Sequence, residues 1–141
     1  MSPTVLITGC TDHGLGSSLA NTFAQRGCKV IATLRAPVDR CTLNHPNITI
    51  LPLDVTSQDS VDSIAAYNVD ILVNNAGRTV PGPILDVDVT NVASLMDANV
   101  YGMIRVVKAL VPGMIKRRRG LVVNIGSCVA IVPTSLSGEY L

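Results

Sequence analysis

The chain has 141 residues, of which 48% are hydrophobic and 15% charged, and its formal net charge is +1. This length favours one domain over residues 1–141 with an aliphatic core, and the balanced charge does not favour nucleic acid as a partner. No apolar run reaches the roughly 18 residues of a membrane span, and no secretory signal is visible. The four cysteines are widely spaced without a C-x-x-C pair, which favours reduced thiols in a cytoplasmic protein and argues against a metal site.

A glycine-rich turn separates the first predicted strand from the first predicted helix. The strand is the apolar, β-branched run at residues 3–8, and the turn reads Thr8-Gly9-Cys10-Thr11-Asp12-His13-Gly14-Leu15-Gly16. Glycines let the backbone approach a ligand, and the helix N-terminus behind them presents N–H groups that suit a pyrophosphate. A tight turn that binds nothing is the alternative for this motif taken alone. Asp12 is expected to point outward and cap the turn.

Helices and strands alternate along the chain. The first helix is expected at 15–26, ending at Gly27, and its buried face is expected to hold Leu15, Leu19 and Phe23, with Ala20 and Ala24 beside them. Further strands are expected at 28–34, 48–53, 70–73 and 121–125. A helix capped by Thr56 or Ser57 is expected to carry Val61, Ile64 and Ala65. A long helix is expected over about 91–116, with a kink at Pro112, and a loop over 129–141.

This alternation predicts an α/β fold: a Rossmann-type, doubly wound parallel sheet in the order 3-2-1-4-5. Ligands of such sheets bind at the carboxyl ends of the strands. Five polar or glycine residues follow predicted strand ends and are expected at that edge: Gly9, Arg35, Asp54, Asn75 and Ser127.

In these motifs the whole chain resembles the short-chain dehydrogenase/reductase family. The turn is similar to the family's T-G-x-x-x-G-x-G with one residue more, as in members grouped with acyl-dihydroxyacetone-phosphate reductases and hydroxysteroid dehydrogenases. The family's N-N-A-G is intact at residues 74–77, and its helix asparagine matches Asn99. Ser127 and Tyr140 stand at the family's serine-to-tyrosine interval. The family's active-site lysine would fall at position 144, so the resemblance implies a sheet truncated C-terminally, after the tyrosine.

The resemblance also implies a nicotinamide cofactor. The positions that match its cofactor-binding residues are Gly9, Gly14, Leu15, Gly16, Arg35, Asp54, Asn75, Ala76 and Gly77. Arg35 stands where NAD-preferring members carry an acidic residue, and a guanidinium there suits a 2′-phosphate, so NADP is the expected cofactor. A solvated arginine is the alternative. Asp54 is similar to the family's adenine-contacting aspartate, and a cap for the following helix is a second, compatible interpretation.

For catalysis, the resemblance implies that Tyr140 donates a proton to a substrate carbonyl, Ser127 hydrogen-bonds its oxygen and Asn99 holds a water of the proton relay. The alternatives are a turn residue for Ser127, an amide bonded to backbone for Asn99 and a frayed terminal aromatic for Tyr140. The expected function is an NADP(H)-dependent oxidoreductase that interconverts a carbonyl and a secondary alcohol on a small lipid-like or secondary-metabolite substrate. A catalytically inactive cofactor-binding remnant is the alternative, and the chain without the lysine is expected to be inactive or very slow.

Two segments carry secondary expectations. The basic run 116–119 invites a nucleic-acid or nuclear-localisation interpretation, but cations at the end of a long helix complement its dipole, and this explanation is preferred. The strand at 121–125 would be an exposed apolar edge, which favours homo-oligomers or aggregation.

Overall fold

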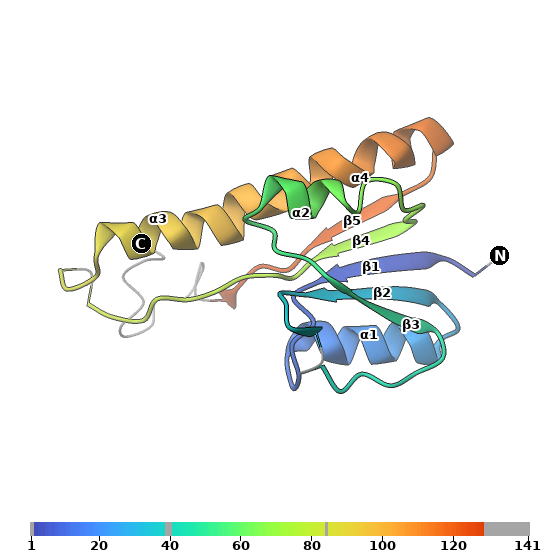
Figure 1. Ribbon diagram of the computed structural model, residues 1–141, viewed down its shortest axis with the longest axis horizontal. Helices are drawn as coiled ribbons and strands as arrows, with labels where there is room; N and C mark the ends of the chain where they lie inside the picture. Colours follow the sequence, from blue (N-terminus) through green and yellow to red (C-terminus); the bar gives the residue numbers. More distant parts are fainter. Residues whose placement is uncertain (1, 39–40, 84, 129–141) are drawn as a thin grey trace.

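Five parallel strands form one sheet in the computed structural model, which describes residues 2–38, 41–83 and 85–128. Their order is β3-β2-β1-β4-β5, which confirms the predicted doubly wound order (Figure 1). The strands are β1 (Thr4–Thr8), β2 (Lys29–Leu34), β3 (Ile48–Pro52), β4 (Ile71–Asn74) and β5 (Leu121–Asn124). Every bound lies within one residue of its prediction. The expected loop at 129–141 and Tyr140 lie outside the described residues.

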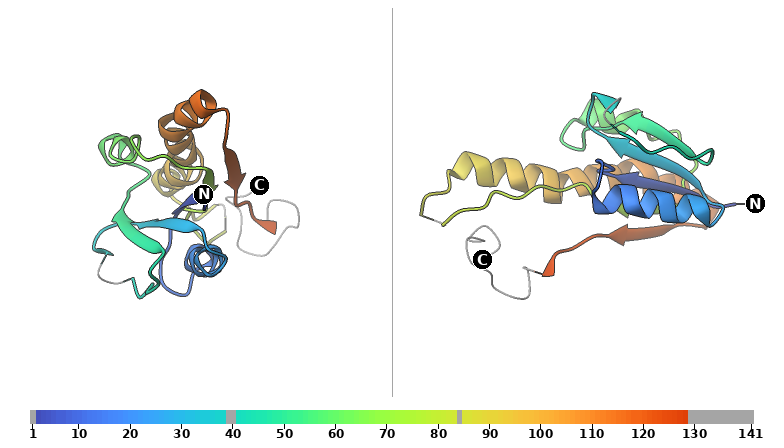
Figure 2. Two further views of the ribbon diagram at one scale, coloured as in Figure 1. Left: turned by 90° about the vertical axis from the view of Figure 1, so that its right-hand side faces the viewer. Right: turned by 90° about the horizontal axis from the view of Figure 1, so that it is seen from below.

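Helices cover both faces of this sheet (Figures 1 and 2). One face carries α1 (Leu15–Gln25), and the other carries α2 (Gln58–Asp62) and a long helical run. The run consists of α3 (Val89–Met96), the π-helical segment η2 (Asp97–Gly102) and α4 (Met103–Arg117), with Pro112 inside α4. No described helix is both long enough and apolar enough to cross a membrane.

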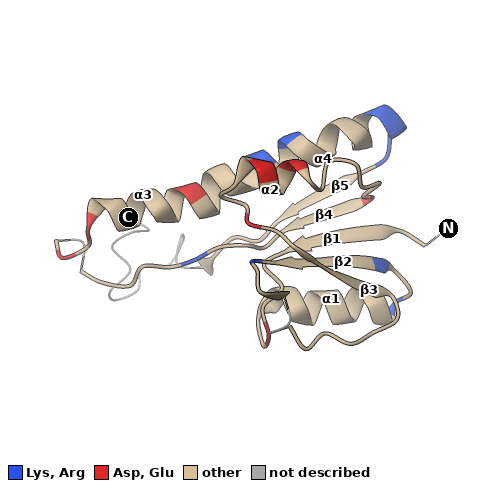
Figure 3. Cartoon of the chain, in the orientation of Figure 1, with Lys and Arg blue, Asp and Glu red and all other residues tan. Residues whose placement is uncertain are grey.

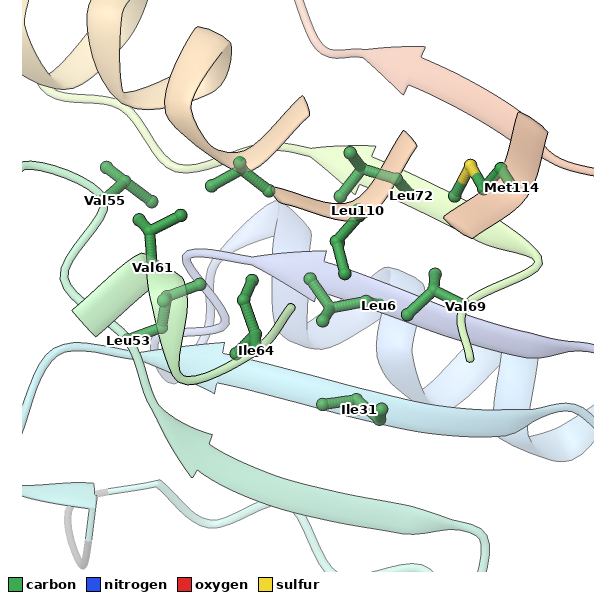
Figure 4. Packing of buried hydrophobic residues seen from close by; sticks show 11 residues of the cluster. Leu6, Ile31, Leu53, Val55, Val61, Ile64, Val69, Leu72, Leu110 and Met114 are labelled. Atoms are coloured by element: carbon green, nitrogen blue, oxygen red, sulfur yellow. The ribbon is translucent and has the colours of Figure 1, made fainter. Parts of the chain in front are cut away.

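Two aliphatic cores flank the sheet, and neighbouring residues of a strand enter opposite cores. Leu6 of β1 lies in the core under α2 and α4, whereas Val5 and Ile7 lie in the core under α1. All three are fully buried, and burying such a side chain contributes about 1.5–3 kcal/mol relative to exposure. Figure 4 shows the first core, which also contains Ile31, Leu53, Val55, Val61, Ile64, Val69, Leu72, Val106, Leu110 and Met114. Burial on both faces explains why the strands are continuous apolar runs.

The buried face of α1 agrees with the expectation except at Leu15, because Leu19 and Phe23 are partly buried against the core that contains Ala20 and Ala24. Its buried apolar residues are the small Ala20 and Ala24, while Leu15 is 54% exposed. Leu15 is the first residue of the helix and lines a cavity at the sheet edge, so its place in the four-residue repeat is not a core position. The end of the helix is as predicted, because Gly27 follows it with a φ of 83°, a value that glycine adopts readily.

The helix after β3 is shorter than predicted. Ser57 is its N-cap, accepting a hydrogen bond from the Ser60 N–H at 3.3 Å, so the second of the two predicted caps is correct. The helix ends at Asp62, and Ile64 is buried in the turn that follows. Ala65, expected on the same face, is exposed.

The basic residues at the end of α4 serve the fold. Arg117 donates hydrogen bonds to Asn68 Oδ1 (2.9 Å) and Val69 O (2.7 Å), and Arg119 Nε lies 3.2 Å from Asp70 Oδ1. These contacts join the end of α4 to the connection that leads into β4, at the amino edge of the sheet, where Figure 3 shows the basic cluster. Lys116 and Arg117 lie in the last turn of α4, the position that the helix-end interpretation requires.

Candidate functional site

The carboxyl ends of the strands line a groove made of three adjoining cavities. The central cavity, of about 280 Å³, is lined by the glycine-rich turn, by residues that follow β2, β3 and β4, and by Ala98 of η2. It shares Arg35 and Asp54 with a cavity of about 640 Å³ on one side. On the other side it shares residues 75–78 with a cavity of about 470 Å³ that reaches Ser127. The groove therefore follows the edge of the sheet at which doubly wound folds bind ligands.

This groove brings together most of the residues singled out in the sequence. Those that line the central cavity are Gly9, Gly14, Leu15, Arg35, Asp54, Asn75, Ala76 and Gly77. Gly16 is buried at the start of α1 against Gly9 and Asn75. Asn99 and Ser127 line the cavity at the β5 end. Tyr140 lies outside the described residues, so the predicted pairing of Tyr140 with Ser127 stays a prediction.

Two glycines of the turn permit contacts that other residues would prevent. Gly9 has a φ of 74°, and a Cβ there would lie 2.7 Å from Ala76 Cα. A Cβ on Gly16 would lie 2.6 Å from both Gly9 O and Asn75 Nδ2. Real Cβ atoms do not approach this closely, so the turn packs directly on the segment after β4 because these residues are glycines.

Thr8 and Asn75 fasten these two segments to each other. The Thr8 hydroxyl accepts hydrogen bonds from the backbone N–H groups of Asn75 (3.0 Å) and Ala76 (2.9 Å). In return, Asn75 Nδ2 donates to Thr8 O (2.8 Å) and Gly9 O (3.1 Å). The Asn75 side chain is therefore used to hold the turn. Sequence analysis missed Thr8 as a site residue, although its place at the end of β1, directly before the first glycine, was a usable signal.

Asp54 and Arg35 stand on neighbouring strand ends with different surroundings. Asp54 Oδ1 accepts hydrogen bonds from Thr56 Oγ1 (2.7 Å) and Thr56 N (2.9 Å). The hydroxyl bond, then the backbone bond, lower the pKa of the Asp54 carboxyl below its usual value, and the Arg35 guanidinium adds a smaller effect in the same direction. Asp54 thus orders the turn ahead of α2, whose N-cap is Ser57. Arg35 is exposed and lines two of the cavities.

Asn99 holds the loop after β4 through both ends of its amide. Its Oδ1 accepts from Arg78 N and its Nδ2 donates to Arg78 O, each at 2.9 Å. Asn99 lies in η2, and π-helical turns are rare and frequently mark functional sites. The alternative of an amide that bonds backbone is therefore observed, with the partner on another segment. A water held by Asn99 stays a prediction.

The expectation that Asp12 caps its own turn is wrong. Its Oδ1 accepts hydrogen bonds from Thr42 N (2.8 Å) and Thr42 Oγ1 (3.0 Å), which ties the turn to the β2–β3 connection. The nearby Cys41 Sγ donates to Cys10 O at 3.6 Å. Burial raises the pKa of the Cys10 thiol to about 12, so this thiol is protonated at neutral pH. The described cysteines are free thiols, and the described residues contain no cluster suited to a metal ion.

A doubly wound parallel sheet, a glycine-rich turn after β1 and a groove at the strand ends define a fold of the Rossmann type, in which ligands bind at this edge of the sheet. Comparison with known sequences narrows this class. The sequence profile of the short chain dehydrogenase family matches residues 3–141. The chain therefore belongs to the short-chain dehydrogenase/reductase family, as its motifs indicated.

Known relatives extend beyond this chain. It is 38% identical to the NADPH-dependent 1-acyldihydroxyacetone phosphate reductase of Schizosaccharomyces pombe, over 96% of this chain and 48% of the relative. It is 39% identical to short-chain dehydrogenase RED1 of Pyricularia oryzae, over 96% of this chain and 50% of that protein. The closed form of serine dehydrogenase complexed with NADP+ matches with a TM-score of 0.85 and 32% identity, over 97% of this chain and 59% of that structure. The chain spans about half the length of the curated relatives it matches.

Proposed function

We propose that the protein is an NADP(H)-dependent oxidoreductase that interconverts a carbonyl and a secondary alcohol. The observation that carries the proposal is the continuous groove, which has the glycine-rich turn at its centre, Arg35 at one end and Ser127 at the other. A nicotinamide cofactor, when bound, donates or accepts a hydride, and a groove of this layout suits a molecule with two separated nucleotide halves.

The residues present fit such a cofactor. Gly9 and Gly16 pack so closely on the segment after β4 that a Cβ at either position would strike it, which leaves a smooth backbone surface at the start of α1. The N-terminal N–H groups of α1 suit a pyrophosphate. Neither of the hydrogen bonds that described residues donate to the Asp54 carboxylate uses Oδ2, so this oxygen can accept from a ribose hydroxyl or an adenine amino group.

Arg35 supports NADP over NAD. A guanidinium forms paired, charge-assisted hydrogen bonds with phosphate, whereas a ribose 2′-hydroxyl offers it no charge. No described carboxylate forms an ion pair with Arg35 within 4.0 Å. The side chain therefore stands beside the groove with its charge available to a ligand. Two of the solved relatives are described as bound to NADP+ or NADP, in agreement with this choice.

Ser127, Asn99 and Tyr140 are proposed for the reacting end. Ser127 and Asn99 line the same cavity, where a serine hydroxyl suits a carbonyl oxygen and Asn99 holds the cavity wall through Arg78. The proton is assigned to Tyr140 on the family motif alone. The acyldihydroxyacetone phosphate reductase among the relatives supports a small lipid-like carbonyl compound as the substrate.

Cofactor titration tests this proposal. The wild-type protein is expected to bind NADPH more tightly than NADH, measured by calorimetry or by nicotinamide fluorescence. Gly16→Ala is expected to weaken NADPH binding by about tenfold or more, since its Cβ must displace Gly9 O or the Asn75 amide. Gly113→Ala in α4 is the matched control, because Gly113 lines none of the three cavities and a Cβ there meets only the flexible end of the Arg117 side chain, at 3.2 Å.

A folded wild-type protein that binds neither NADPH nor NADH would overturn the proposal. The catalytic assignment has its own test, a panel of carbonyl compounds that includes an acyldihydroxyacetone phosphate. Any NADPH-dependent reduction is expected to disappear in Tyr140→Phe, while NADPH affinity is retained. An unchanged reduction rate in that variant would remove Tyr140 from the mechanism.

A further inference from the structure

The segment η2 forms a wall that two cavities of the groove share. Its Ala98 lines the central cavity and its Asn99 lines the cavity that reaches Ser127. A π-helical turn is wider than an α-helical turn and has poorer geometry, so it persists only where surrounding contacts determine it. The contacts that hold η2 therefore also set the shape of the groove.

Arg105 of α4 contacts η2 from outside the groove. Its Nη2 forms an ion pair with Asp97 Oδ1 at 2.7 Å, and its Nη1 lies 3.5 Å from Asp97 O. Nη1 also lies 3.4 Å from Val55 O, in the loop after β3. The two charged side chains are only 27% and 36% exposed, so solvent screens this ion pair less than a surface pair. The planar fork of a guanidinium lets one side chain contact all three oxygens.

Val55 connects these contacts to the opposite wall of the groove. It follows Asp54 and lines the central cavity. Gly102, the last residue of η2, packs so closely on it that a Cβ at Gly102 would lie 2.7 Å from Val55 Cγ2. Arg105 thus bridges the first residue of η2 and the loop on which its last residue rests.

We propose that Arg105 is a positioning residue of the groove. Together with Asp97 it holds η2 against Val55, and it thereby sets the places of Ala98 and Asn99. Arg105 lines neither cavity, so any effect on a ligand passes through η2 or Val55. The cofactor measurement below rests on the proposed function, whereas the exchange measurement does not.

The test combines hydrogen–deuterium exchange with NADPH titration of Arg105→Gln. The Arg78 N–H donates to Asn99 Oδ1, so its exchange rate reports the position of Asn99. Exchange at Arg78 and over residues 97–103 is expected to become faster in the variant. NADPH affinity is expected to fall by roughly 2- to 30-fold, the range for residues that act on a ligand without touching it.

Conservative variants separate charge from geometry. Asp97→Asn keeps the shape of the carboxylate without its charge and is expected to act in the same direction but less strongly. Arg105→Lys keeps the charge but not the fork, and it is expected to restore part of the NADPH affinity lost in Arg105→Gln. If Arg105→Gln does not fold, Asp97→Asn carries the test.

Arg119→Gln is the matched control, because it removes a second Arg–Asp ion pair, which lies at the amino edge of the sheet. It is expected to lower the melting temperature while Arg78 exchange and NADPH affinity stay at their wild-type values. Wild-type exchange at Arg78 in Arg105→Gln would overturn the inference, as would faster exchange with unchanged NADPH affinity. A wild-type protein that binds no cofactor would refute the proposed function instead, and the exchange comparison alone would then decide whether Arg105 holds η2.

Discussion

Asn99 and Arg78 are joined by two hydrogen bonds of 2.9 Å, both between the Asn99 amide and the Arg78 backbone. The pair links the helical run to the loop after β4, at a distance of 21 residues in sequence. Asn99→Ala leaves the N–H and C=O of Arg78 without these partners. Both bonds are exposed to solvent, so we expect this variant to lose about 1 kcal/mol of unfolding free energy, measured by denaturant titration.

Asn68→Ala provides the comparison for this prediction. Asn68 Oδ1 accepts one hydrogen bond of 2.9 Å from Arg117, which is exposed like the two at Asn99, so its loss is expected to be about half as large. Asn99→Asp is expected to fall between the two, since a carboxylate accepts from Arg78 N but cannot donate to Arg78 O. Equal losses of unfolding free energy in Asn68→Ala and Asn99→Ala would show that the two bonds between Asn99 and Arg78 stabilise the fold no more than the single bond of Asn68.

The sheet was predictable because its strands are buried on both faces. Runs such as residues 48–53 have few polar residues and end at a polar or glycine residue, so bounds and order followed from the alternation with helices. The π-helical turn was not predictable. The apolar spacing over 91–116 fits a regular α-helix as well as one with a π-helical turn. The wider turn at Asp97–Gly102 packs against Val55, a contact that the spacing does not reveal.

The sequence predicted the motif residues of the groove but not the residues that hold them in place. The glycine and N-N-A-G positions stand in recognisable motifs at strand ends, so their convergence was foreseen. Thr8 was overlooked because a threonine at a strand end has ordinary β propensity, and only the folded chain places its hydroxyl against Asn75. In the sequence, Arg105 has the pattern of a solvated charge on a helix. Its partner Val55 lies 50 residues away in the sequence, so only the fold brings the two together.

Arg35→Asp tests the cofactor preference. Reversing this charge removes the paired hydrogen bonds proposed for the 2′-phosphate and adds repulsion. NADPH affinity is expected to fall by about tenfold or more, since a hydrogen bond to a charged group contributes roughly 1.5–3 kcal/mol. NADH affinity is expected to hold or rise. Both are measured by titration under the same salt conditions, because exposed charges are screened.

Lys29→Asp is the control for Arg35→Asp, since it makes the same reversal of charge at the amino end of the same strand, away from the groove. It is expected to leave the ratio of NADPH to NADH affinity unchanged. A wild-type protein with equal affinities for the two cofactors would exclude Arg35 as a selector of the 2′-phosphate.

Thr56→Ala is expected to make a pH-dependent contribution to stability disappear. The Thr56 hydroxyl lowers the pKa of Asp54 in the folded protein, so this stabilisation is present above the ordinary aspartate pKa of about 3.9 and is lost as pH falls through the lower folded value. The stability difference between wild type and Thr56→Ala is thus expected at pH 7 and not at low pH. Solvent screening of this mostly exposed group keeps it below about 1 kcal/mol. Denaturant titration at several pH values measures it.

Thr90→Ala is the control for Thr56→Ala, because it removes the same kind of threonine–aspartate hydrogen bond outside the groove. Asp88 Oδ1 accepts from Thr90 N and Thr90 Oγ1, both at 2.7 Å, and these bonds lower the pKa of Asp88 in the same way. Thr90 lines none of the three cavities, whereas Thr56 lines the central one. Both variants are expected to show the same pH trend, and only Thr56→Ala is expected to weaken NADPH binding. If NADPH affinity falls equally in Thr90→Ala, the weaker binding is a consequence of lower stability and not of the position of Thr56 in the groove.

The outer edge of β5 is expected to drive self-association. Leu121 N donates to Asp70 O and Ile125 N donates to Asn74 O, so the alternating backbone groups of Val122 and Asn124 point away from β4. Among the described residues no strand pairs with this edge, and Val122 is 36% exposed. An apolar strand edge without a partner is a template for strands of other molecules.

Val122→Lys is expected to reduce this association, because a lysine on an edge strand opposes pairing. Leu85→Lys is the control, since Leu85 is 94% exposed but lies in the loop before α3. Light scattering at several protein concentrations measures the mean mass of each variant. We expect the wild type and Leu85→Lys to grow with concentration and Val122→Lys to stay closer to the monomer. A wild-type protein that remains monomeric at all concentrations would show that the β5 edge is protected in solution.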